Sequence, residues 1–238
     1  MVSNFTEVLR SFQHADSFFP SGTVAMSSGL ESLNVEGIVD SSDSIERFLL
    51  GQLKWRWATM ERSFVIHAAK AKLDYDALSA IDSQIEILSL AREVRDGSVR
   101  SGRALLKVHT QLGTAGADRY EARINQGLAI GHNQVVQGLV WSSVGIRLNQ
   151  IELMSAHIFC VGILGAALRL GMIGHSAVQS ILSNSHTVVE TILKEPCPLL
   201  DEVTSFTPEQ EIAVMRHEVM SWRLFINCLL YTSPSRRD

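Results

Sequence analysis

The segment Ala15-Asp16-Ser17-Phe18-Phe19-Pro20-Ser21-Gly22 interrupts the helical pattern close to the N-terminus and sets where the first helix ends. Pro20 fixes its own φ and disfavours the helical conformation at the residue before it, while Gly22 tolerates backbone angles that other residues resist. The side chains of Asp16 and Ser17 can bond backbone amides in such a turn. Two adjacent aromatic residues lie inside this loop, so we expect it to press onto the core or onto another protein.

Apolar residues at helical spacing flank this loop on both sides. Before the loop, one stripe is formed by Phe5, Val8, Leu9 and Phe12. After it, a second helix is predicted from about Val24 to Glu36.

A long helix is predicted to begin at the signal Asp43-x-x-Glu46. Its inward-facing residues are expected to be Ile45, Phe48, Leu49, Leu53, Met60 and Phe64. Trp55 and Trp57 also lie on it, and residues two apart diverge by about 200° on a helix of 3.6 residues per turn. One tryptophan therefore points elsewhere, toward a neighbouring helix or another subunit.

Apolar residues keep the helical period through the rest of the chain. We expect helices to begin at Asp74 or Asp76, at Arg92, after His132, at Asn149, at Ser176 and at Thr207-Pro208. No sustained alternation of polar and apolar residues, as in strands, is present. The sequence therefore predicts an all-α, single-domain multi-helix bundle over residues 1–227, with residues 228–238 as a disordered or non-native tail.

Composition excludes several classes of function. The chain has 238 residues, of which 46% are hydrophobic and 19% charged, and its net charge is −4. The charge offers no general attraction to nucleic acid or to an anionic membrane, and the apolar excess suits a bundle with an additional buried interface. Three widely spaced cysteines do not predict a disulfide framework, and the first residues do not resemble a secretory signal. We expect a cytoplasmic protein with neither nucleic acid nor membrane as a partner.

The middle of the chain carries a basic run and two glycine-containing features. The charges between Arg92 and His109 are typical of a solvated helix face, and Gly102 on that helix is expected to kink it or to admit a close backbone. The loop Leu112–Gly116 lacks the Lys-Ser/Thr ending of a phosphate-binding loop, so we do not expect this chain to hydrolyse a nucleotide.

Four motifs in order resemble the UreF family of urease accessory proteins. The opening motif is Asp16–Gly22 followed by Ser27-Ser28-Gly29-Leu30-Glu31, although Met26 stands where the family usually has His. The other three motifs are Ser101–Leu106, Gly131–Gly138, and His217-Glu218 followed by Arg223-Leu224-Phe225. Together they cover nearly the whole chain.

The resemblance implies a non-enzymatic, typically dimeric helical protein. Such a protein bridges the nickel-carrying GTPase UreG to UreD, also called UreH, and the assembly delivers nickel to apo-urease. No resident cofactor is implied, and nickel would be handled by the assembly. By resemblance, the partner-binding residues are Asp16, Ser17, Pro20, Gly22, His132, His217, Glu218, Arg223, Leu224 and Phe225. For His217-Glu218, the alternative is a solvated pair on the last helix.

Other hypotheses remain open at this point. A helical-bundle enzyme would use Asp16, His132 or Glu218 as an acid or base in a shared pocket. A helical interaction domain unrelated to urease is another alternative. A GTPase-activating role through an inserted arginine has four candidates, namely Arg95, Arg100, Arg103 and Arg223.

Overall fold

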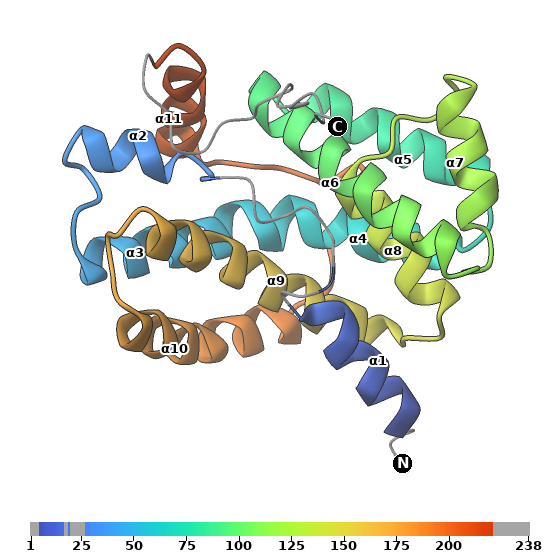
Figure 1. The fold of residues 1–238 in the computed structure, drawn as a ribbon, viewed down its shortest axis with the longest axis horizontal. Helices are drawn as coiled ribbons and strands as arrows, with labels where there is room; N and C mark the ends of the chain where they lie inside the picture. Colours follow the sequence, from blue (N-terminus) through green and yellow to red (C-terminus); the bar gives the residue numbers. More distant parts are fainter. Residues whose placement is uncertain (1–4, 17–18, 20–26, 221–238) are drawn as a thin grey trace, which may run out of the picture.

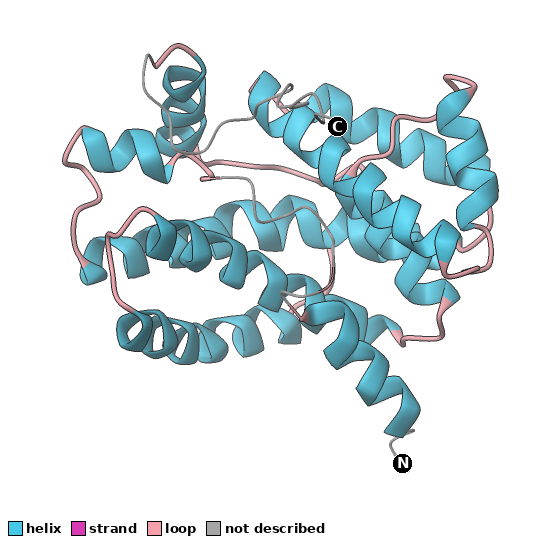
Figure 2. Cartoon of the chain, in the orientation of Figure 1, coloured by secondary structure: helices cyan, strands magenta, loops and turns pink. Residues whose placement is uncertain are grey.

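The computed structural model describes residues 5–16, 19 and 27–220 of the chain. Over these residues the chain forms helices joined by loops, with no strand (Figure 2). The predicted all-α fold is confirmed. The predicted tail, residues 228–238, lies outside the described residues.

Figure 1 shows the arrangement of the helices. In chain order they are α1 (Phe5–Ala15), α2 (Leu30–Val35), α3 (Ser42–Gln52), η2 (Leu53–Glu61), α4 (Arg62–Ala71), α5 (Tyr75–Leu88), α6 (Arg92–Gln111), α7 (Ala117–Asn125), α8 (Asn133–Ser143), α9 (Leu148–Arg169), α10 (His175–Lys194) and α11 (Pro208–Glu218).

Helix starts differ from the sequence prediction at several points. Helix α3 is capped by Ser41, two residues before the acidic signal at Asp43, because the Ser41 hydroxyl accepts from the Ser44 amide and the Ser44 hydroxyl accepts from the Ser41 amide. Helix α2 begins only at Leu30, because Ser28 and Gly29 take positive φ values of 53° and 83°. The predicted start of a helix near Val24 is therefore wrong for residues 27–29.

Helices α3, η2 and α4 form one continuous rod, whose middle part is a π-helix. Along it Trp57 is fully buried and Trp55 is 57% exposed, so the predicted divergence of the two tryptophans is confirmed. The backbone amide of Phe206 donates to the Trp55 carbonyl at 2.9 Å, and that of Thr204 donates to the Thr59 carbonyl at 3.2 Å. These bonds fasten the segment before α11 along the rod.

Two hydrophobic cores lie on opposite sides of the molecule. One is built mainly from α4, α5, α6, α7 and α8, and the other mainly from α2, α3, η2, α9 and α10. The rod and α9 contribute to both, since Ile151 and Met154 of α9 belong to the first core and Cys160 and Ile163 to the second. These two elements therefore join the halves of the bundle.

Helix α1 packs on the bundle with its polar side. The amide and the guanidinium of Arg147 donate to Glu7 at 3.0 and 2.7 Å, and Glu7 is buried. The apolar stripe faces outward instead: Phe5, Leu9 and Phe12 are 80%, 65% and 67% exposed. Figure 1 shows α1 projecting from the lower edge of the molecule. This orientation is the reverse of that of an ordinary amphipathic helix on a core.

Helix α9 is apolar on all sides but only partly covered. Among the described residues it is the one helix long and apolar enough, by length and composition, to cross a membrane, and 50% of its most apolar window is buried inside the bundle. A core helix of a soluble protein passes the same test. The sequence interpretation of this segment as a bundle helix agrees with its contacts to α10, α4 and α1.

Candidate functional site

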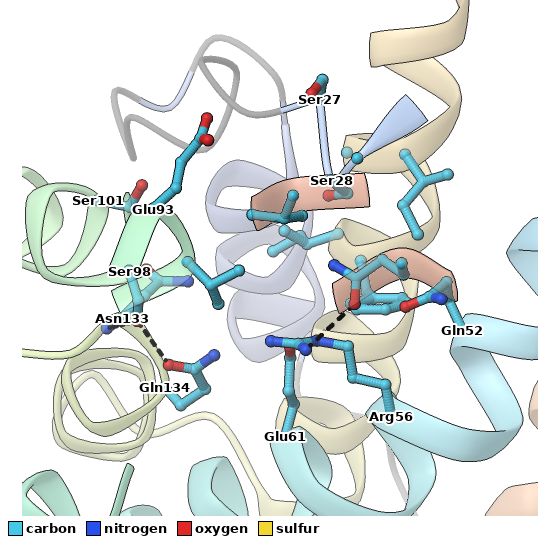
Figure 3. Close-up of a pocket in the computed structure, with 18 of the residues that line it drawn as sticks. Ser27, Ser28, Gln52, Arg56, Glu61, Glu93, Ser98, Ser101, Asn133 and Gln134 are labelled. Atoms are coloured by element: carbon cyan, nitrogen blue, oxygen red, sulfur yellow. Dashed lines mark hydrogen bonds and ion pairs between the residues drawn. The ribbon is translucent and has the colours of Figure 1, made fainter. Parts of the chain in front are cut away.

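A cavity of about 140 Å³ lies between the two cores (Figure 3). Its walls come from residues 27–29 just before α2, from the end of α3, and from η2, α6, α8, α9 and α11. Apolar side chains of α9 form part of the wall, and polar residues dominate the rest, among them Gln52, Arg56, Ser98, Asn133, Gln134 and Gln137. We call this space the inter-core cavity.

Polar residues of the inter-core cavity bond to one another, both within η2 and between helices. Arg56 donates to Glu61 at 2.8 Å and to the Gln210 side chain at 3.5 Å, and Ser98 donates to Gln134 at 2.9 Å. The side-chain oxygen of Asn133 is buried without a hydrogen-bond partner. This wall can therefore bond water or a small polar group.

A close crossing of α6 and α8 positions this wall. A Cβ at Gly102 would lie 2.2 Å from the Gly131 carbonyl oxygen and 2.7 Å from the Asn133 amide nitrogen. The expectation that another backbone approaches Gly102 is confirmed. Because the helices meet so closely, the Ser98 hydroxyl accepts from the Asn133 amide at 3.2 Å and lies 3.2 Å from the His132 ring.

His132 is fully buried and is held by carboxylates rather than facing a partner. The carboxylate of Asp82 accepts from the backbone amides of Ile130, Gly131 and His132 at 2.7, 2.6 and 2.8 Å. The ring of His132 bonds Glu86 at 3.0 Å. Burial lowers the pKa of His132. The structure thus gives His132 an internal role in fixing the entry to α8.

His217 is also buried, between two carboxylates from different helices. Its Nε2 lies 2.9 Å from Glu31 of α2, and its Nδ1 lies 2.8 Å from Glu93 of α6. The hydrogen bond with Glu93 raises the pKa of His217, while burial opposes that shift. The alternative of a solvated His217-Glu218 pair is wrong for His217. Glu218 is half-buried and pairs with Arg92 of α6.

The remaining predicted site residues lie apart from this cavity or outside the described residues. Asp16 is exposed, and its carbonyl accepts from the Phe19 amide at 3.0 Å. Phe19 packs against the first core, as expected for this loop. Ser17, Pro20, Gly22, Arg223, Leu224 and Phe225 lie outside the described residues.

The arrangement offers little for catalysis. His217 lines the inter-core cavity, but Asp16, His132 and Glu218 do not, so the acid and base residues of the enzyme hypothesis are not gathered there. No group of three or more histidine, cysteine or acidic residues in the described part of the chain is placed to hold a metal ion. Burial raises the pKa of the Cys160 thiol to about 11, which keeps it protonated at neutral pH.

Two of the candidate GTPase-activating arginines are engaged within the chain. Arg95 donates to the carbonyls of Ser89 and Leu90 at 2.6 and 2.8 Å, and Arg103 donates to the Ile130 carbonyl at 3.0 Å. Insertion of either into a partner would first break these bonds.

Sequence reasoning missed the carboxylates that organise both histidines. Glu31 belongs to the opening motif, which was the available signal for it. Asp82 and Glu93 lie on the amphipathic helices α5 and α6 and match no motif. Their partners are 50 and 124 residues away, so only the folded chain reveals them.

Comparison with known proteins agrees with the motifs. A family model described as UreF matches residues 39–186. Urease accessory protein UreF of Trichodesmium erythraeum (strain IMS101) is 30% identical over 232 residues, which cover 94% of this chain and 99% of the relative. The UreF proteins of Paenarthrobacter aurescens (strain TC1) and Cereibacter sphaeroides (strain ATCC 17025 / ATH 2.4.3) are 28% and 26% identical, and the matches cover 90% and 87% of this chain and 96% and 92% of the relatives. These matches overturn the hypothesis of a helical domain unrelated to urease. The chain belongs to the UreF family of urease accessory proteins, whose role lies in urease maturation.

Proposed function

We propose that this chain is a non-enzymatic scaffold that bridges the GTPase UreG and the accessory protein UreD/UreH while nickel is inserted into apo-urease in the cytoplasm. The family name supports a role among accessory proteins rather than a catalytic one. The partner pair comes from the resemblance of the four motifs. Nickel is cargo of the assembly in this proposal, and the chain itself needs no cofactor.

The outward apolar stripe of α1 is the observation that carries the proposal. Phe5, Leu9 and Phe12 are three large side chains on one helix face, exposed although the polar face of the same helix is bonded to the bundle. Their burial by a partner would remove apolar area from water, which stabilises association by roughly 25 cal/mol per Å² before ordering costs. We assign this face to UreD/UreH, beside the loop that contains Asp16, Ser17, Pro20 and Gly22.

Helix α9 supports the further proposal of a homodimer. Its sequence is apolar on every side, yet Leu153 is exposed and several neighbouring residues are only half-buried. A second copy would cover this face.

Co-purification tests the bridging proposal. The tagged chain is co-expressed with UreD/UreH and UreG, and the triple variant Phe5→Ser/Leu9→Ser/Phe12→Ser is compared with Ile87→Ser, which alters a side chain 77% exposed on α5. We expect the triple variant to lose UreD/UreH by at least about tenfold, because apolar anchors at an interface contribute ~1–2 kcal/mol each. The Ile87→Ser control should retain it.

The melting temperature of both variants should stay near that of the parent, since the altered side chains face solvent. Retention of UreD/UreH by the triple variant would refute the assignment of α1. In the same assay, Phe225→Ala tests the C-terminal motif Arg223-Leu224-Phe225, and an intact assembly would remove that motif from the proposal.

A further inference from the structure

Three consecutive residues in the last turn of α11 each contact a neighbouring helix through charge. Arg216 donates at 2.8 Å to Glu36, the residue that caps the C-terminal end of α2, and Glu218 pairs with Arg92 of α6. Between them, His217 contacts both helices at once. Together these contacts hold the last turn of α11 to the end of α2 and to α6.

The central contact of this turn requires a particular protonation state. Both ring nitrogens of His217 lie within 2.9 Å of a carboxylate oxygen, and the ring is 1% exposed. A neutral imidazole has one N–H and one lone pair, and an ionised carboxylate only accepts. With both carboxylates ionised, the two bonds therefore form together only when the ring carries two N–H groups and a positive charge.

The surroundings of His217 favour that charge. The charged groups on the elements around His217 are Glu31 of α2, Glu36 at the C-cap of α2, Arg92 and Glu93 of α6, Arg56 and Glu61 of η2, and its own neighbours Arg216 and Glu218. Most of these pair with each other. Glu31 and Glu93 are the two carboxylates that directly face the ring.

We propose that His217 is a proton-dependent latch that holds the last turn of α11 to α2 and α6 while its ring is charged and releases this turn when the ring becomes neutral. On loss of the proton, a lone pair would face a carboxylate oxygen across less than 3 Å inside a buried site, which is repulsive. This device depends only on contacts within the chain and does not require the bridging role.

The direction of the pH effect follows from linkage. The hydrogen bonds with Glu93 and Glu31 raise the pKa of folded His217 above the ordinary value of 6.5. The latch is therefore fully closed below about pH 6.5 and opens as the pH rises through the folded pKa. Each unit between the pKa values of the closed and open forms corresponds to about a tenfold change in the opening equilibrium.

Amide hydrogen exchange of the full chain tests the latch between pH 6 and 9.5. Rates are corrected for intrinsic base catalysis and compared with those of peptides from the middle of α8, where residues 135–141 are buried. We expect protection of peptides in 208–220 to fall by about tenfold or more across this range. Unchanged relative protection of α11 would overturn the proposal.

Three variants separate the latch from simple packing. His217→Gln should give low, pH-independent protection in α11, whereas Glu93→Gln should move the transition to lower pH. Glu209→Gln, on the exposed face of the same helix, should leave the transition where it is. A transition that ignores Glu93→Gln would contradict the assignment.

An NMR titration of the parent protein tests the latch without depending on whether the variants fold. The His217 ring should titrate with a midpoint above 6.5. A midpoint at or below 6.5, or a neutral ring beside a protonated glutamic acid across the whole range, would refute the latch.

Discussion

Replacement of Gly102 by alanine should separate α6 from α8 and lower the stability of the whole bundle. The added Cβ would lie 2.2 Å from the Gly131 carbonyl oxygen, 2.7 Å from the Asn133 amide nitrogen and 2.8 Å from the His132 carbonyl carbon. Ordinary contact distances are about 3.5–4.0 Å, so the two backbones must move apart by roughly 1 Å. All three contacts are backbone atoms, which cannot rotate away as a flexible side chain does.

The magnitude follows from three effects. Overpacking of this kind costs about 3 kcal/mol, at the upper end of the usual range. A separation of that size also weakens the Ser98 bonds to Gln134 and Asn133, now 2.9 and 3.2 Å long, at about 1 kcal/mol each. The better helix propensity of alanine offsets about 1 kcal/mol. The net loss is about 4 kcal/mol, or about 8–16 °C in melting temperature for a chain of this size.

Calorimetry and urea denaturation measure this loss, with Gly51→Ala as the matched control. Gly51 lies in α3, and a Cβ there meets nothing within 4 Å, so only the propensity gain of about 0.5–1 kcal/mol remains. The two variants should therefore change stability in opposite directions. A Gly102→Ala protein within about 1 kcal/mol of Gly51→Ala would refute the close-crossing argument.

Two further predictions concern buried polar groups. Asp82→Asn keeps the shape of the side chain but turns one acceptor into a donor that faces backbone amides, so we expect the free energy of unfolding to fall by about 3 kcal/mol and amide exchange at residues 130–132 to become faster. The control Asp76→Asn, on the surface, should change the free energy of unfolding by less than about 0.5 kcal/mol. Equal losses in the two variants would contradict the buried role of Asp82. The stacked rings of His14 and His109 have pKa values lowered to about 4 by burial, so the unfolded chain binds more protons and stability should be lost as pH falls from about 6.5 toward 4. Thermal melts from pH 7.5 to 4.5 should show a shallower decline for His109→Asn than for the parent, and identical slopes would refute this.

Local patterns predicted much of the fold. The apolar period located most helices, and the angle between successive positions on a helix established that Trp55 and Trp57 could not share a face. Helix starts were less accurate, because Ser41 and Ser44 cap α3 through a reciprocal bond that competes with the more visible acidic signal.

The orientation of α1 could not be predicted from its sequence. An apolar stripe usually marks the inward face, and only the bonds of Glu7 to Arg147, 140 residues away, reveal the reverse. The same limit applies to the histidines. Motifs selected His132 and His217, but the carboxylates that bond their backbone or ring come from distant helices.

Because the apolar face of α1 points outward, selection for stability and selection for urease maturation should act differently on its residues. A mutational scan scored by thermal melting should report Phe5, Leu9 and Phe12 as tolerant positions, because solvent already surrounds them. A scan scored by active urease in cells should report the same positions as intolerant. Disagreement between the two scans at these three positions, each about one helical turn from the next, would locate the partner's binding surface without a structure of the complex.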